Sequence, residues 1–178
     1  MIKYPKHSLW LIPPRGVYTR LEKIISDLSR EHQAPIFRPH VTLLASVPGS
    51  EKEVIKNAHR FSRLIKPFDV TLTSVDYSDQ YFRCLFIRAR KSRALMDANL
   101  RARGIFGKQS DEKYMPHLSL MYGNFQPEVK ESIIEKIGRD FNITFTARCL
   151  CVDSEGEDIE GWRVIKEFKL GRIRRISS

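Results

Sequence analysis

The sequence lacks most features that would place this protein in a membrane, outside the cell or around a metal ion. No apolar run approaches the roughly 18 residues of a transmembrane helix, and the first ten residues lack the apolar core of a secretory signal. The three cysteines, Cys84, Cys149 and Cys151, are too few for a disulfide framework, so we expect reduced thiols in a cytoplasmic protein. Neither zinc-ligand spacing nor a glycine-rich phosphate loop occurs, and we therefore expect neither a metal nor a cofactor.

Positive charge is present in excess. Lys and Arg number 31 against 21 Asp and Glu, which gives a formal net charge of +10. The stretch 88–108 holds seven basic residues and one acidic residue, and 166–175 holds five against one. This pattern predicts an anionic partner, either a phosphorylated small molecule or nucleic acid, although solvated helix faces would give the same pattern.

The order of predicted elements indicates one domain over residues 1–171, followed by a disordered basic tail at 172–178. Helices are predicted over 17–29, 50–65, 92–103 (closed by Gly104) and 127–137, and strands over 7–12, 40–47, 68–77, 81–90, 117–122, 141–152 and 162–170. The segments PHVTLL and PHLSLM each open a strand, helix, strand, strand unit, so the chain contains two repeats at about 35–90 and 112–170. We expect an α+β, bilobal fold with two pseudo-symmetric antiparallel-rich sheets around a central cleft and helices outside.

The two repeat starts bring chemistry with them. Residues i and i+2 of a strand share a face, so His40 lies beside Thr42 and His117 beside Ser119. Imidazole titrates near neutrality, so one histidine can accept a proton from water while the other donates one to a departing oxygen. The hydroxyls can donate hydrogen bonds to phosphate oxygens. A single histidine in an apolar strand is usually a core residue, but two in equivalent repeat positions favour metal-free phosphodiester hydrolysis.

These His-x-Thr/Ser pairs resemble the motifs of the 2H phosphoesterase superfamily. The segments SLWLIP, RPHVTL, YFRCLF, YMPHLSLMY and CLCVDSEGEDIEGW are similar, in order and spacing, to those of the plant and yeast type cyclic nucleotide phosphodiesterases. The resemblance covers nearly the whole chain. It implies a metal-independent enzyme with a bilobal 2H phosphoesterase-like fold, which opens nucleoside 2',3'-cyclic phosphates to 2'-phosphates. It also implies action on ADP-ribose 1'',2''-cyclic phosphate, a by-product of tRNA splicing, to give the 1''-phosphate.

The same resemblance assigns residues to roles. It makes His40 and His117 the catalytic pair, and the residues it places at the substrate are Thr42, Ser119, Tyr122, Trp10 and Phe82. From the residues alone, Trp10 and Phe82 fit the core as well as they fit a wall of the site. Tyr122 reaches the site only if the chain bends at Gly123.

Two other functions remain open on the sequence. One is a 2',5'-phosphodiesterase or RNA end-processing enzyme of the same superfamily, which the charge favours because polyanions gain from many phosphate contacts. The other is a non-catalytic module that binds RNA or nucleotides, against which the intact histidine and hydroxyl pairs argue. We expect a monomer whose partner is a small cyclic nucleotide or ADP-ribose cyclic phosphate, with RNA as the alternative and no membrane.

Overall fold

The structure, a computed structural model, describes residues 6–108, 114–155, 159 and 161–171. The predicted tail at 172–178 lies outside these residues. The strands are β1 (Lys6–Leu11), β2 (Val41–Val47), β3 (Phe68–Tyr77), β4 (Leu85–Ala89), β5 (His117–Met121), β6 (Asp140–Ala147), β7 (Cys149–Glu155) and β8 (Arg163–Lys169). The helices are α1 (Arg15–His32), α2 (Glu51–Leu64), α3 (Arg93–Ile105) and α4 (Pro127–Ile137), with one 3₁₀ turn, η1 (Tyr81–Arg83).

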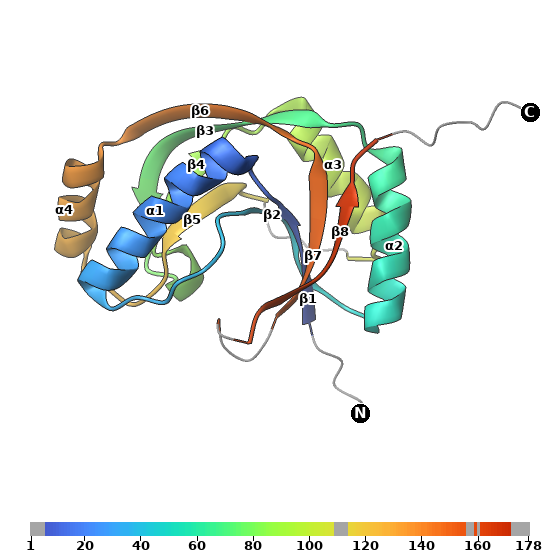
Figure 1. Cartoon of the computed structure of the whole chain (residues 1–178), viewed down its shortest axis with the longest axis horizontal. Helices are drawn as coiled ribbons and strands as arrows, with labels where there is room; N and C mark the ends of the chain where they lie inside the picture. The colour runs from blue at the N-terminus through green and yellow to red at the C-terminus, as the bar shows by residue number, and fades with distance from the viewer. Residues whose placement is uncertain (1–5, 109–113, 156–158, 160, 172–178) are drawn as a thin grey trace, which may run out of the picture.

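All eight strands belong to one curled antiparallel sheet in the order β6-β3-β4-β5-β2-β1-β7-β8 (Figure 1). Its two halves, β5-β4-β3-β6 and β2-β1-β7-β8, meet where β5 pairs with β2. The α+β class and the two-part architecture are confirmed. The expectation of two separate sheets was wrong in one respect, because the register pair Val41–Leu118 joins them into a continuous sheet.

The first strands of the two predicted repeats, β2 and β5, are the pair at the centre. The remaining strands do not stay with them: β3 and β4 follow β2 in sequence but lie in the half that contains β5. Likewise β7 and β8 follow β5 in sequence but lie beside β1. The half β5-β4-β3-β6 is therefore built from the middle of the chain and the half β2-β1-β7-β8 from its two ends. Strand β6 runs directly into β7 to cross between the halves (Figure 1).

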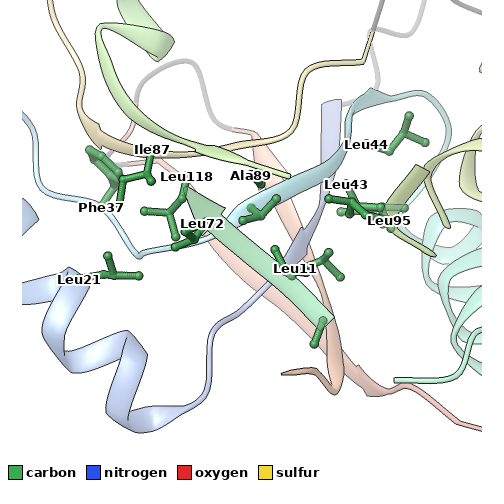
Figure 2. Close-up of a cluster of buried hydrophobic side chains, with 14 of the residues drawn as sticks. Leu11, Leu21, Phe37, Leu43, Leu44, Leu72, Ile87, Ala89, Leu95 and Leu118 are labelled. Atoms are coloured by element: carbon green, nitrogen blue, oxygen red, sulfur yellow. The ribbon is translucent and has the colours of Figure 1, made fainter. Parts of the chain in front are cut away.

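One face of the sheet is apolar and is covered by the helices. Leu43 and Leu118 are fully buried on the central strands, and Figure 2 shows Leu43 next to Leu95 of α3. Helix α1 contributes Leu21 and Ile25 to the same core, as its apolar spacing predicts. The helices pack on this face, so the residues that alternate with Val41, Leu43 and Leu118 point to the other face.

Local signals set several element ends. The predicted capping box at the start of α2 is present: the Ser50 hydroxyl accepts from the Glu53 amide at 3.4 Å, and the Glu53 carboxylate accepts from the Ser50 amide at 3.0 Å. Pro127 stands in the first turn of α4, where its missing N–H costs nothing. Gly104, however, does not close α3, because the helix continues through it to Ile105.

Two predicted strands are broken. The segment 81–90 begins with η1 instead of extended chain, because the Ser78 hydroxyl donates to the Arg83 carbonyl at 2.7 Å and folds the turn back. The segment 141–152 is two strands separated by Arg148, whose carbonyl accepts from Leu170 at 2.7 Å. The first break follows from a side-chain bond within the turn and the second from a tertiary contact, and local periodicity reports neither of them.

Candidate active site

The central strand pair assembles the predicted quartet. Val41 and Leu118 are the middle residues of the two motifs, and they are the residues that pair. In an antiparallel pair the flanking residues face each other, so His40 lies across from Ser119 and Thr42 across from His117. All four side chains share the face opposite the helices. The pairing of equivalent residues therefore brings both polar pairs together, as the repeat predicted.

Beyond this one register pair, β2 and β5 diverge, and side chains satisfy β2 carbonyls instead. The Tyr114 hydroxyl donates to the Thr42 carbonyl at 2.9 Å, and the buried Asn99 amide donates to the Leu43 carbonyl at 2.7 Å. Lys108 donates to the Ala45 carbonyl. These bonds let the sheet open at its centre without orphaned backbone groups.

Each histidine is held in the same way. Nδ1 of His40 donates to the Arg38 carbonyl at 2.7 Å, and Nδ1 of His117 donates to the Met115 carbonyl at 2.9 Å. A carbonyl can only accept, so Nδ1 must carry a proton in both cases. Nε2 is therefore the nitrogen that titrates and that can exchange a proton with a substrate. The identical arrangement, two residues after each carbonyl and directly after a proline, reflects the repeat.

Burial sets the charge of the pair. The pKa of His40 is lowered to about 4, mainly by burial and to a smaller extent by the positive charges of His117 and Arg38. Burial also lowers the pKa of His117, as do the charges of Arg83 and Arg88. Both imidazoles are therefore mainly neutral at pH 7 in the free protein, and a bound phosphate, being negative, would favour the protonated form of one of them.

The predicted bend after β5 is present. Gly123 has φ 143° and its amide donates to the Tyr81 carbonyl at 3.1 Å, which turns Tyr122 back toward the site. Burial raises the pKa of Tyr122, while its hydrogen bond with the Ser119 side chain acts in the other direction. Ser119 donates to the Phe82 carbonyl at 3.2 Å. Tyr122, Ser119 and η1 therefore form one connected group beside His40.

The two aromatic residues with open assignments differ from each other. Trp10 is only 4% exposed and stacks on the His40 imidazole, with ring centroids 3.8 Å apart and planes 12° apart. Phe82 is 52% exposed, so it is not a core residue. The structure places both beside the quartet, Trp10 through His40 and Phe82 through the Tyr122 ring at 5.5 Å.

Sequence reasoning missed Trp162. Its ring lies 5.7 Å from Trp10, 6.5 Å from His40, 5.8 Å from Phe82 and 6.0 Å from Tyr122. It lies two residues after the segment 153–160, in which five of eight residues are acidic, a composition typical of a solvated loop. Its being one of two tryptophans, within a segment similar to the family, was the available signal.

Three arginines contribute positive charge at the histidines. Arg38 acts on His40, and Arg83 and Arg88 act on His117. Arg88 is paired with Asp76, with Nε 2.7 Å from the carboxylate. Arg83 differs, because its buried Nε has no hydrogen-bond partner among the residues that the structure describes. Within the basic stretch 88–108, Arg88 is thus the residue whose positive charge acts on one of the two histidines, His117.

The three cysteines follow the sequence-based expectation of reduced thiols. Cys84, Cys149 and Cys151 are unpaired thiols, and burial raises the pKa of Cys151 to about 12. Within the described ranges, no group of three His, Cys, Asp or Glu side chains could hold a metal ion. No described helix is long and apolar enough to cross a membrane.

Solved structures share the fold. TT0787 of Thermus thermophilus aligns with a TM-score of 0.66 at 19% identity, over 93% of this chain and 97% of that one. Escherichia coli LigT, solved in complex with 3'-AMP, aligns with a TM-score of 0.66 at 13% identity, over 94% and 99%. At these identities the likeness shows that the protein shares the fold of those structures.

Sequence comparisons define the family. A cyclic phosphodiesterase of Arabidopsis thaliana is 27% identical over 92% of this chain and 94% of its own length. A 2',3'-cyclic-nucleotide 3'-phosphodiesterase of Phaeosphaeria nodorum is 30% identical over 89% and 86%. The family described as cyclic phosphodiesterase-like protein matches residues 6–175. The chain belongs to this family, and it is a phosphodiesterase.

Proposed function

We propose that this protein hydrolyses small cyclic phosphodiesters without a metal ion, using His40 and His117 as the acid–base pair. The substrates are nucleoside 2',3'-cyclic phosphates, which would yield 2'-phosphates, and ADP-ribose 1'',2''-cyclic phosphate, which would yield the 1''-phosphate. The observation that carries the proposal is the matched pair of imidazoles, each with Nδ1–H bonded to a backbone carbonyl. The names of the two relatives, from Arabidopsis thaliana and Phaeosphaeria nodorum, support the reaction class.

The proposed step is the opening of the cyclic phosphate of a nucleoside 2',3'-cyclic phosphate by water. One neutral imidazole takes a proton from water at Nε2 while the water oxygen forms a bond to phosphorus. The bond from phosphorus to the 3'-oxygen breaks, and the other imidazole, in its protonated form, gives its Nε2 proton to that oxygen. Thr42 donates a hydrogen bond to a non-bridging oxygen, where negative charge develops, and Ser119 donates another after its hydroxyl turns from the Phe82 carbonyl to the phosphate. The ring opens to a 2'-phosphate, and both histidines return to their starting states after one proton exchange with water.

Phosphorus NMR tests this directly. Purified protein with a nucleoside 2',3'-cyclic phosphate and EDTA should convert the ring signal to that of a 2'-phosphate. No turnover, or turnover that stops on chelation, would contradict the proposal. His40→Ala and His117→Ala should each lower kcat by about 10²–10⁴-fold, whereas His59→Ala, on the exposed side of α2, should leave it unchanged. Normal nucleotide binding with no hydrolysis by the parent would instead favour a binding module.

A diester with a p-nitrophenolate leaving group distinguishes the acid from the base. Such a leaving group departs without a proton donor, so the variant that has lost only the general acid should recover activity on it. The variant that has lost the base should remain slow on both substrates. Recovery by neither variant, or by both equally, would contradict a division of roles between His40 and His117.

The second candidate substrate is an oligonucleotide. The positive charges of Arg38, Arg83 and Arg88 at the histidines favour it, because a polyanion gains from several such contacts. Rates on a mononucleotide and on an oligonucleotide ending in a cyclic phosphate should be compared over a salt series. A steep fall with salt for the oligonucleotide alone would assign the protein to RNA end processing. Equal and shallow salt dependence would assign it to mononucleotides.

A further inference from the structure

Trp162 is the centre of the aromatic cluster at the site. It precedes β8 in one half of the sheet, and its ring touches Trp10 of β1 in the same half. From the other half it meets Phe82 of η1 and Tyr122 after β5. Rings from both halves therefore hold one indole beside the central strand pair. The interplanar angles to Trp10 and Tyr122 are 58° and 70°, so these neighbours fix the orientation of Trp162 largely through edge contacts.

Trp10, in contrast, has a ring face that is already occupied. The His40 imidazole covers it at 3.8 Å in a nearly parallel stack, and the side chain is 4% exposed. A base could stack on that face only by displacing the imidazole. Trp10 is therefore suited to holding His40 in position rather than to contacting a substrate ring.

Among Trp162 and the rings that it contacts, Phe82 and Trp162 itself are the ones that solvent can reach. Phe82 is 52% exposed and Trp162 is partly exposed. Their rings are 5.8 Å apart and inclined by 27°, close to the offset stacking that aromatic pairs prefer. An exposed apolar pair beside catalytic side chains is the kind of surface that binds a ligand. Trp162 is also 6.5 Å from His40, so a ligand stacked on it lies next to the proposed acid–base pair.

We propose that Trp162, with Phe82, is the platform on which the base of a cyclic nucleotide stacks, while Trp10 positions the His40 imidazole. The inference rests on the proposed function for its substrate class. It adds a specificity-determining residue that selects cyclic phosphates carrying a flat heteroaromatic ring. Stacking of a base on an aromatic side chain needs no particular hydrogen bonds, so the platform accepts purines and pyrimidines alike.

Binding provides the first test, and it does not depend on hydrolysis. Adenosine 2'-phosphate and inorganic phosphate are titrated into the parent, Trp162→Ala, Trp162→Phe and Phe168→Ala by calorimetry. Trp162→Ala should weaken adenosine 2'-phosphate by roughly 5- to 150-fold and leave phosphate unchanged, and Trp162→Phe should restore most of the loss. Phe168, a partly buried ring on β8 near His59, is the matched control. Unchanged affinity of Trp162→Ala for adenosine 2'-phosphate would overturn the inference.

Kinetics provides the second test. Adenosine 2',3'-cyclic phosphate is compared with methyl ribofuranoside 2,3-cyclic phosphate, which has the ring phosphate and ribose but no base. Trp162→Ala should raise KM for the nucleotide and leave kcat/KM for the baseless substrate close to that of the parent. Equal losses on both substrates would show that Trp162 acts through His40, which overturns the platform. A parent that binds adenosine 2'-phosphate through Trp162 but hydrolyses neither substrate would refute the proposed function and leave this inference standing.

Discussion

Burial of His40 should make the stability of the protein depend on pH. The pKa of this imidazole is about 4 in the folded protein, against an ordinary value of 6.5. The unfolded chain therefore binds more protons than the folded one between these values. Stability contributed by neutral His40 is fully present above pH 6.5 and is lost as the pH falls toward 4.

The expected size follows from the shift. One pKa unit corresponds to about 1.4 kcal/mol. For a shift of this size, the free energy of unfolding at pH 5 is therefore lowered by about 2 kcal/mol, because the unfolded chain binds the proton more tightly. Stacking on Trp10 acts in the opposite direction, because an indole face attracts a cation by about 0.5–2 kcal/mol. Subtracting this attraction leaves about 0–1.5 kcal/mol, so we expect His40 to account for up to about 1.5 kcal/mol of the stability lost between pH 7 and pH 5.

Urea unfolding of matched variants measures this contribution. In His40→Asn the side-chain amide can still donate to the Arg38 carbonyl but does not titrate, so its stability should fall less with pH than that of the parent. His59→Asn controls for loss of an exposed histidine. Both proteins contain the same Asp and Glu side chains, so the effect of their titration on stability cancels in the comparison. If the parent and His40→Asn lose the same free energy of unfolding between pH 7 and pH 5, His40 is not held in its neutral form and the reasoning fails.

Three further predictions use other features of the structure. Ser119→Ala and Thr42→Ala should each lower kcat by about 10²–10³-fold in steady-state assays, since each removes a donor to the charged phosphate; a change confined to KM would contradict this. Lys130 is 1% exposed and bonds a backbone carbonyl at 3.1 Å, so Lys130→Met should lower the free energy of unfolding in urea by about 1–3 kcal/mol, and no loss would contradict it. Gly123 has a positive φ, and a Cβ there would overlap the Phe125 ring, so the thermal unfolding midpoint of Gly123→Ala should lie well below that of Gly16→Ala, whose Cβ would meet no other atom. Equal midpoints would contradict this prediction.

Short-range patterns in the sequence were enough for most elements and for the quartet. Alternation and helical spacing report which residues face the core, and capping at Ser50 or proline at Pro127 acts within one turn. The quartet was predictable because two equivalent motifs must adopt equivalent conformations. Elements that depend on distant partners were not: η1 accepts hydrogen bonds from Gly123 and Ser119, and the strand break at Arg148 comes from Leu170.

The sequence by itself determined which residues we propose for the chemistry: two histidines, each followed two residues later by a hydroxyl, in strands whose other face is apolar. Only the tertiary structure decided how these residues are charged and surrounded. Burial lowers both imidazole pKa values, and the charges of Arg83 and Arg88, which lie on segments far away in the chain, lower that of His117. The surroundings of the aromatic residues were decided in the same way, because packing against His40 occupies the face of Trp10 and leaves Phe82 exposed and Trp162 partly exposed.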